Sequence, residues 1–153
     1  MITRRATDKD LPVIIELYRF LQADDPVLNP QDESVREKWA EILRDTRLRY
    51  FVVEAENKTV VSCCALTIIP NLTRGMRSYG VIENVVTNPV FRKRGFATSV
   101  LRAALSDAWA EGCYKVMLLT GRKSEETLQF YERVGFLRGI KTGFVAYPEP
   151  EVD

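Results

Sequence analysis

The residues with the clearest chemical meaning form one short run, Arg92, Lys93, Arg94, Gly95, Phe96 and Ala97, followed by Thr98. A helical apolar period begins directly after Gly95. The first N–H groups of a helix have no partner within it and lie at the positive end of its dipole. Gly95 and the small Ala97 let a ligand approach this backbone closely. The run therefore predicts a binding site for a phosphate or pyrophosphate group.

The same run has two other interpretations. A match to Arg/Gln-x-x-Gly-x-Gly/Ala also arises by chance, and the run is then a basic surface loop whose Gly95 starts a helix. Nucleic-acid binding through Arg92–Arg94 is the other. Lys and Arg number 22 against 21 Asp and Glu, which argues against the broad basic surface of a nucleic-acid partner.

The absence of His restricts the remaining chemistry. It excludes Ser-His, Cys-His and His-metal sites, so catalysis has to use carboxylates, Tyr, Cys, Lys or the backbone. Cys63, Cys64 and Cys113 are odd in number, and two are adjacent in an apolar stretch. We therefore expect reduced core thiols, with no metal, no disulfide framework and no acyl-cysteine intermediate.

The length and composition suit one folding unit that positions these residues. A chain of 153 residues, 46% of them hydrophobic, is long enough to bury a core without a metal or a disulfide. No signal peptide and no run of about 18 apolar residues is present, so we expect a cytoplasmic protein without a membrane partner. We predict a single domain over residues 1–148 and a short acidic tail over residues 149–153.

The elements of the first half follow from hydrophobic periodicity and turn residues. They are a strand over 2–6, a helix running to Leu21, a helix over 33–46, and strands over 49–55, 60–69 and 79–87. Thr7 and Asp10 resemble a capping box that opens the first helix. Pro70–Ser78 is predicted to be a long hairpin loop.

The second half changes to alternating helices and strands. It predicts a helix from Gly95 to Gly112, a strand over Tyr114–Thr120, a helix between Ser124 and Gly135, and a strand or hairpin from Phe136 that includes Gly143–Tyr147. The apolar run Tyr114–Thr120 is typical of a strand covered on both faces, as in parallel sheets. The order predicts an α/β (α+β) domain with one mixed central sheet flanked by helices.

Several of these segments, in this order, resemble the GNAT superfamily of acetyl-CoA-dependent N-acetyltransferases. The segments are Ile2–Leu11, Ile82–Pro89, Arg92–Ala97 and Phe130–Phe136. The resemblance covers nearly the whole chain and is densest from Tyr79 to Phe136. It implies a GNAT-like fold, in which the strand Tyr114–Thr120 splays away from Tyr79–Thr87 and leaves a cleft.

The resemblance implies acetyl-CoA as co-substrate and no metal. In the family, the strand before the loop pairs with the pantetheine arm, and the loop binds the pyrophosphate mainly through backbone N–H groups. The cofactor-binding residues implied are Val85, Val86, Thr87, Arg92, Lys93, Arg94, Gly95, Phe96, Ala97, Thr98, Thr120 and Ser124. The family often has Asn at the position of Ser124.

Acetylation of an amine requires a base for the ammonium proton and an acid for the departing thiolate. Glu83 is the candidate base, because burial in an apolar strand would raise its pKa. The alternative is an exposed carboxylate on the solvent face of the strand. A backbone N–H in the Val85–Val86 region would then stabilise the oxyanion.

Tyr131 is the candidate acid. It shares a helix face with Leu128 and Val134, so its ring is expected to point inward. A core tyrosine with a satisfied hydroxyl fits this spacing equally well. The resemblance favours the acid, because the family's tyrosine at this place points at the cofactor sulfur.

The predicted function is transfer of acetyl from acetyl-CoA to a primary amine of a small molecule, by direct attack through a tetrahedral intermediate. A non-catalytic acyl-CoA-binding sensor and a protein N-acetyltransferase are the alternatives. Ile82–Val86 and Gly112–Val116 also resemble glucosamine-6-phosphate N-acetyltransferases, although Asn84 stands where those enzymes tend to have Asp. The resemblance allows a homodimer, as in many relatives.

Overall fold

The computed structural model describes residues 1–148, which form two compact units, residues 1–118 and the part from Leu119 onward. The first unit contains the sheet and most of the helices, and the second contains one helix. The acidic tail predicted over 149–153 lies outside the described residues. A single domain over residues 1–148 stays a prediction.

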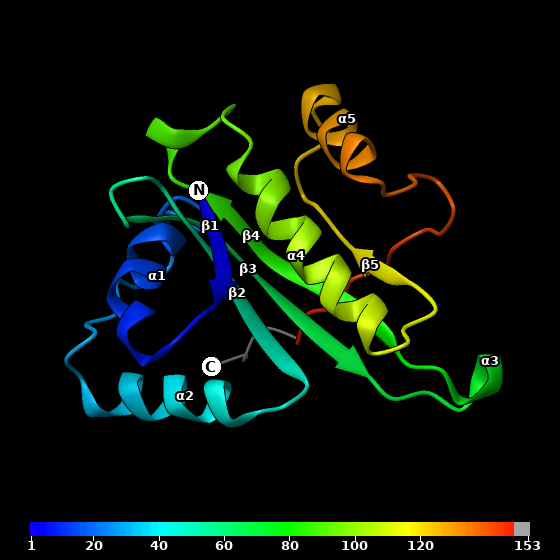
Figure 1. The fold of residues 1–153 in the computed structure, drawn as a ribbon, viewed down its shortest axis with the longest axis horizontal. Helices are drawn as coiled ribbons and strands as arrows, with labels where there is room; N and C mark the ends of the chain where they lie inside the picture. Colours follow the sequence, from blue (N-terminus) through cyan, green and yellow to red (C-terminus); the bar gives the residue numbers. More distant parts are fainter. Residues whose placement is uncertain (149–153) are drawn as a thin grey trace. The chain divides into compact units, whose positions relative to one another are not determined.

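The first unit is built on one five-stranded sheet with the spatial order β1-β2-β3-β4-β5 (Figure 1). The strands are β1 (Ile2–Arg5), β2 (Leu48–Glu54), β3 (Val60–Ile69), β4 (Tyr79–Thr87) and β5 (Val116–Leu118). The first three pairings are antiparallel, and β5 runs parallel to β4. The predicted mixed sheet is therefore confirmed, with the bounds of β3 and β4 as predicted.

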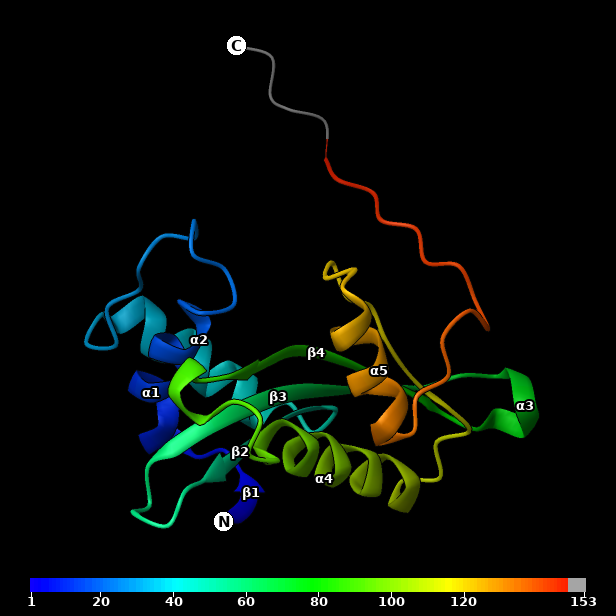
Figure 2. The ribbon, with the colours of Figure 1, turned by 90° about the horizontal axis from the view of Figure 1, so that it is seen from above.

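Helices cover both faces of this sheet: α1 (Leu11–Tyr18) and α2 (Glu33–Arg44) lie on one face and α4 (Phe96–Ala110) on the other (Figure 2). Two adjacent cysteines show the division. Cys63 packs in the core cluster of α1 and α2, whereas the Cys64 thiol faces the Val100 carbonyl of α4 at 3.8 Å. Successive strand side chains point to opposite faces. Burial raises the pKa of Cys63 to about 12, so this thiol is a core residue, as predicted.

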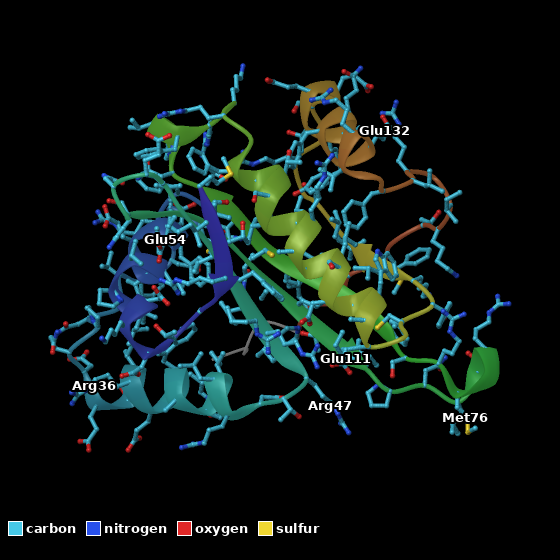
Figure 3. The ribbon with its side chains drawn as sticks, in the orientation of Figure 1. Arg36, Arg47, Glu54, Met76, Glu111 and Glu132 are labelled. Carbon is cyan, nitrogen blue, oxygen red and sulfur yellow. The ribbon has the colours of Figure 1, made fainter. Side chains whose placement is uncertain are left out.

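Several short elements connect the larger ones. They are the 3-10 turns η1 (Asp8–Asp10) and η2 (Pro89–Phe91) and the helical turn α3 (Thr73–Met76). The turn α3 lies inside the predicted loop Pro70–Ser78, and Met76 at its end is 76% exposed (Figure 3). No helix within residues 1–148 has the length and apolar character needed to cross a bilayer. Nor do three or more His, Cys, Asp or Glu side chains gather there in a cluster suited to a metal ion.

Three predicted elements differ from the structure. Helix α1 ends at Tyr18 and not at Leu21, and β5 covers only Val116–Leu118 of the predicted Tyr114–Thr120. No strand is present over the described residues from Phe136 onward, where Phe144 and Tyr147 are 90% and 84% exposed. Aromatic and β-branched residues favour a strand only where a neighbouring strand pairs with them.

The second unit contains the helix α5 (Glu125–Val134). The Ser124 hydroxyl accepts a hydrogen bond from the Thr127 N–H at 3.4 Å, and Gly135 ends the helix with φ 117°. Ser124 is therefore a helix cap, as predicted. Arg138 pairs with Glu132 at 3.0 Å, on the exposed side of this helix (Figure 3).

An ion pair between the half-buried Arg4 and the buried Asp10 fixes the N-terminal strand to the start of the first helix. Arg4 donates two hydrogen bonds to the Asp10 carboxylate, at 2.7 and 2.9 Å, and one to Glu54 of β2 at 2.7 Å. The Thr7 N–H also donates to Asp10, which is 4% exposed. Burial alone would raise the pKa of Asp10, but the hydrogen bonds from Arg4 and Thr7 outweigh it and lower that pKa.

We predict that Asp10→Asn lowers the free energy of unfolding at pH 7 by about 1–3 kcal/mol, because it removes a buried carboxylate that accepts two hydrogen bonds from Arg4 and leaves Glu54 as the remaining charged acceptor of that arginine. The pKa of Asp10 is lowered on folding. Its contribution is therefore complete above the unfolded pKa of about 3.9 and is lost as the pH falls through the lower folded pKa. Urea denaturation at pH 7 and pH 3 measures both effects.

The matched control is Glu41→Gln, which removes an exposed carboxylate that pairs with Lys38. We expect little change in stability from this variant, because exposed ion pairs contribute little. Equal losses in the two variants, or a loss from Asp10→Asn that is as large at pH 3 as at pH 7, would contradict the assignment.

Candidate functional site

Strand β4 is interrupted in its middle. Glu83 pairs with Ala65 and Val86 pairs with Cys63, so two residues of β4, Asn84 and Val85, oppose one residue of β3. This arrangement is a β-bulge, a feature that bends a strand and redirects its groups, often beside active sites. Asn84 has φ 54°, in the left-handed region that Asn tolerates better than most residues.

The other edge of β4 is open over the same stretch. β5 pairs with β4 only at Gly80, Val81 and Ile82. Over Glu83–Thr87, no strand of residues 1–148 pairs with this edge. The predicted pantetheine-binding residues Val85–Thr87 all lie on it. An extended ligand that carries amide groups can add to such an edge as a further strand would.

Polar contacts hold the end of β4 in place. Ser62, which is fully buried, donates to the Val86 carbonyl at 2.9 Å, and its hydroxyl lies 2.8 Å from that of Thr87. Arg92 donates from Nε to the Thr87 carbonyl at 3.2 Å. This arginine therefore closes the loop after β4 onto the end of that strand.

The loop leads into an N-terminus of α4 that has no side-chain cap. Gly95 occupies the cap position with φ 84°, and the first turn contains no acidic residue. The N–H groups of Phe96, Ala97 and Thr98 therefore receive no cap from a side chain. The first turn of α5 differs, because Ser124 caps it and acids follow. The start of α4 keeps the electrostatic character of an anion site.

Two aromatic rings hold Arg94 beside this helix start. Its guanidinium carbon lies 5.4 Å from the Phe91 ring centroid and 5.8 Å from that of Phe96. A surface hollow next to it is lined by Met1, Ala55, Glu56, Asn57, Phe91, Arg94 and Phe96. Lys93 has φ 59°, so the loop makes a tight turn just before Gly95. The predicted loop residues thus surround one helix terminus in the first unit.

The structure places Glu83 directly before the bulge, with its side chain exposed. The expected burial of Glu83 is wrong, although Val86, on the same open edge and the same face, is only 5% exposed. Burying a carboxylate costs free energy unless a partner compensates its lost hydration, so the charged side chain stays in contact with water. The pairing of Glu83 with Ala65, two residues from Cys63, puts its side chain on the face covered by α1. The carboxylate is on that face and accessible.

Tyr131, Thr120 and Ser124 belong to the second unit. The Tyr131 ring is half-buried and packs against Phe130 and Phe136, with centroid distances of 5.0 and 6.1 Å. The Thr120 hydroxyl accepts from the Arg122 N–H at 3.2 Å. In this unit the three residues are held by local contacts, and their predicted roles toward the cofactor stay predictions.

Tyr18 is a further residue of interest that was not expected from the sequence. This residue ends α1, and its hydroxyl is buried without a hydrogen-bond partner in residues 1–148. An unpaired buried hydroxyl costs about 1–3 kcal/mol, so it needs an explanation. In the sequence, Tyr18 has the spacing of an ordinary core residue beside Ile14 and Leu17, and no local signal shows that its hydroxyl lies near Asn84.

The chain was compared with known proteins. The sequence model of the Acetyltransferase (GNAT) family matches residues 14–136. A solved putative acetyltransferase from Agrobacterium tumefaciens str. C58 is 42% identical, with a TM-score of 0.89, and the match covers 97% of this chain and 100% of that one. An acetyltransferase structure from Trypanosoma brucei is 28% identical, with a TM-score of 0.79 and 95% and 99% coverage.

A curated relative carries a more specific name. The glucosamine 6-phosphate N-acetyltransferase of Trypanosoma brucei brucei is 39% identical over 77 residues, which are 50% of this chain and 50% of that protein. The chain spans 50% and 59% of the lengths of the first two curated relatives that it matches.

We predict that Asn84→Val lowers the free energy of unfolding by about 1–3 kcal/mol, because a β-branched residue is strained at positive φ. Asn84→Gly removes the same amide but permits the left-handed backbone, so we expect a much smaller loss. Urea denaturation of the two variants measures the difference. Equal losses would show that the bulge does not constrain this residue.

Proposed function

The chain belongs to the Acetyltransferase (GNAT) family, and from this premise we propose that it transfers acetyl from acetyl-CoA to a primary amine of a small molecule. The observation that carries the proposal is the continuity of two binding features. The open edge of β4 ends at Thr87, and the loop that follows leads to the uncapped start of α4. An extended cofactor with a pyrophosphate in its middle matches an open strand edge followed by a helix N-terminus.

In this proposal the backbone of Val85–Thr87 pairs with the pantetheine amides. The N–H groups at the start of α4, from Phe96 to Thr98, hold the pyrophosphate, and Gly95 leaves space for it, since nothing lies within 4 Å of a Cβ placed there. Arg92 contributes by fixing the loop to the Thr87 carbonyl, at 3.2 Å. Acetyl-CoA supplies the activated acetyl group as a thioester.

The acetyl transfer needs one group to accept a proton and one to donate a proton. Glu83 takes a proton from the ammonium form of the acceptor, directly or through a water, and the neutral nitrogen bonds to the acetyl carbon. A backbone N–H of the bulge, in the Val85–Val86 region, stabilises the oxyanion. Tyr131 protonates the thiolate as the carbon–sulfur bond breaks. The acylated nitrogen then gives its second proton to the Tyr131 phenolate, directly or through a water, and Glu83 releases the first proton to solvent. The exposure of Glu83 supports this role, because the base has to meet an acceptor that arrives from solvent.

Glucosamine 6-phosphate is the first acceptor to test, because a curated relative that is 39% identical over 77 residues is named for it. Asn84 stands where such enzymes tend to have Asp, so a panel of other amino sugars and simple amines accompanies it. Release of the free thiol of CoA reports turnover with any member. Binding of acetyl-CoA without thiol release across the panel would favour the non-catalytic acyl-CoA-binding module.

We predict that Thr98→Glu weakens acetyl-CoA binding at least about tenfold, because a carboxylate in the first turn of α4 competes with the pyrophosphate for the same N–H groups. The control Thr98→Gln has nearly the same size without the charge, and we expect affinity nearer to the wild type. Isothermal titration calorimetry measures both, and thermal melting checks the fold. Equal affinities for the two variants would contradict pyrophosphate binding at this helix start.

We predict that Glu83→Gln lowers kcat by about 10²–10⁴-fold, the usual contribution of a general base. Glu83 is exposed, so we expect little change in stability, and acetyl-CoA affinity should be retained. Steady-state thiol release with the best acceptor measures the effect. Glu41→Gln, at an exposed carboxylate of α2, is the matched control. Wild-type kcat in Glu83→Gln would remove Glu83 from this role.

A further inference from the structure

Tyr18 carries a buried group that the proposed mechanism does not use. Its ring packs against the core cluster between α1, α2 and the sheet. Among residues 1–148, its hydroxyl oxygen is the one buried side-chain nitrogen or oxygen that lacks a hydrogen-bond partner. Folded proteins almost always pair such groups, and the exceptions often serve function.

The surroundings of this hydroxyl connect it with the site. The polar side chains beside it are Tyr50 of β2 and Asn84 of the β4 bulge. Neither makes a hydrogen bond of normal geometry with it. Glu83 and Val86, on either side of the bulge, pair with Ala65 and Cys63 and so lie on the face that α1 covers. Tyr18 therefore approaches the bulge from the face that carries the proposed base.

The hydroxyl can act only as a neutral hydrogen-bonding group. Burial raises the pKa of Tyr18 far above its ordinary value, and the neighbouring Cys63 and Tyr50 raise it further. It keeps its proton and can donate one hydrogen bond while accepting another. A neutral hydroxyl of this kind suits a role in orienting a neighbouring group.

Asn84 is the neighbour that needs orienting. Its side chain is half-buried, and its backbone at φ 54° is held in the left-handed region. An amide presents either its oxygen or its NH₂ group, so an unconstrained Asn84 would show an amine both an acceptor and a competing donor. A fixed partner on one side of the amide selects which end faces the acceptor.

We infer that Tyr18 is a positioning residue for acetyl transfer, whose hydroxyl orients the Asn84 amide toward the acceptor amine. In the reacting complex the Asn84 NH₂ group donates to Tyr18, Tyr18 donates to Tyr50, and the Asn84 oxygen accepts from the amine beside Glu83. The inference rests on the proposed function. It accounts for the unpaired hydroxyl as a partner held ready for a substrate-bound arrangement.

The test is Tyr18→Phe, which removes only the hydroxyl. Removal of a hydroxyl that stabilises the fold lowers the urea midpoint. Removal of an unpaired hydroxyl leaves the midpoint unchanged or raises it. We expect an unchanged or higher midpoint, kcat/KM for the amine at least about tenfold lower, and an unchanged KM for acetyl-CoA. The control Tyr79→Phe, at the opposite end of β4, should leave all three values unchanged.

A double-mutant cycle separates action through Asn84 from a direct effect. In the Asn84→Gly background, Tyr18→Phe should cause no further loss in kcat/KM, because the amide it orients is gone. Additive losses in kcat/KM, unchanged kinetics in Tyr18→Phe, or a lower urea midpoint in that variant would each overturn this inference and leave the proposed function in place. Failure of the wild type to release thiol with any amine would overturn the proposed function, and this inference with it.

Discussion

The site depends on one constraint, the loss of pairing along one edge of β4. This strand pairs with β3 on one side, but β5 accompanies it only over Gly80–Ile82. Backbone N–H and C=O groups on the open edge require partners from water or a ligand. The bulge at Asn84 and the exposure of Glu83 occur in the same stretch. A sheet paired to its end on both sides would leave no such stretch for a ligand.

The helix that follows complements this open edge. Its N-terminus begins at Gly95, which offers no side chain to the first-turn N–H groups, whereas α5 begins at Ser124, which does. Of these two helices, α5 is thus capped by its own side chain, and α4 retains its attraction for an anion. Placed after the open edge, the uncapped start gives the proposed cofactor two successive backbone-binding segments. In the proposed complex both segments bind through backbone groups, so the Arg92 side chain can hold the loop at the Thr87 carbonyl, as it does here.

Local physical chemistry explains which features the sequence could predict. β-branched and aromatic residues between turn signals predicted the bounds of β3 and β4, and Thr7 with Asp10 marked the 3-10 turn η1 that leads into α1. The exposure of Glu83 was missed because its apolar neighbours in β4 suggest a buried strand, whereas a carboxylate is buried only where a partner compensates its lost hydration. The strand expected over Gly143–Tyr147 is absent because propensity alone forms no strand. Tyr18 was missed because its proposed role depends on Asn84, which lies 66 positions away in the sequence.

Amide hydrogen exchange with and without saturating acetyl-CoA tests the central claim most directly, because the claim concerns backbone N–H groups. The account predicts added protection in two segments, Val85–Thr87 and Phe96–Thr98, with none in β1 (Ile2–Arg5), which already pairs with β2. Calorimetry on the same samples establishes that the ligand is bound. Bound acetyl-CoA that leaves exchange in both segments unchanged would contradict the account.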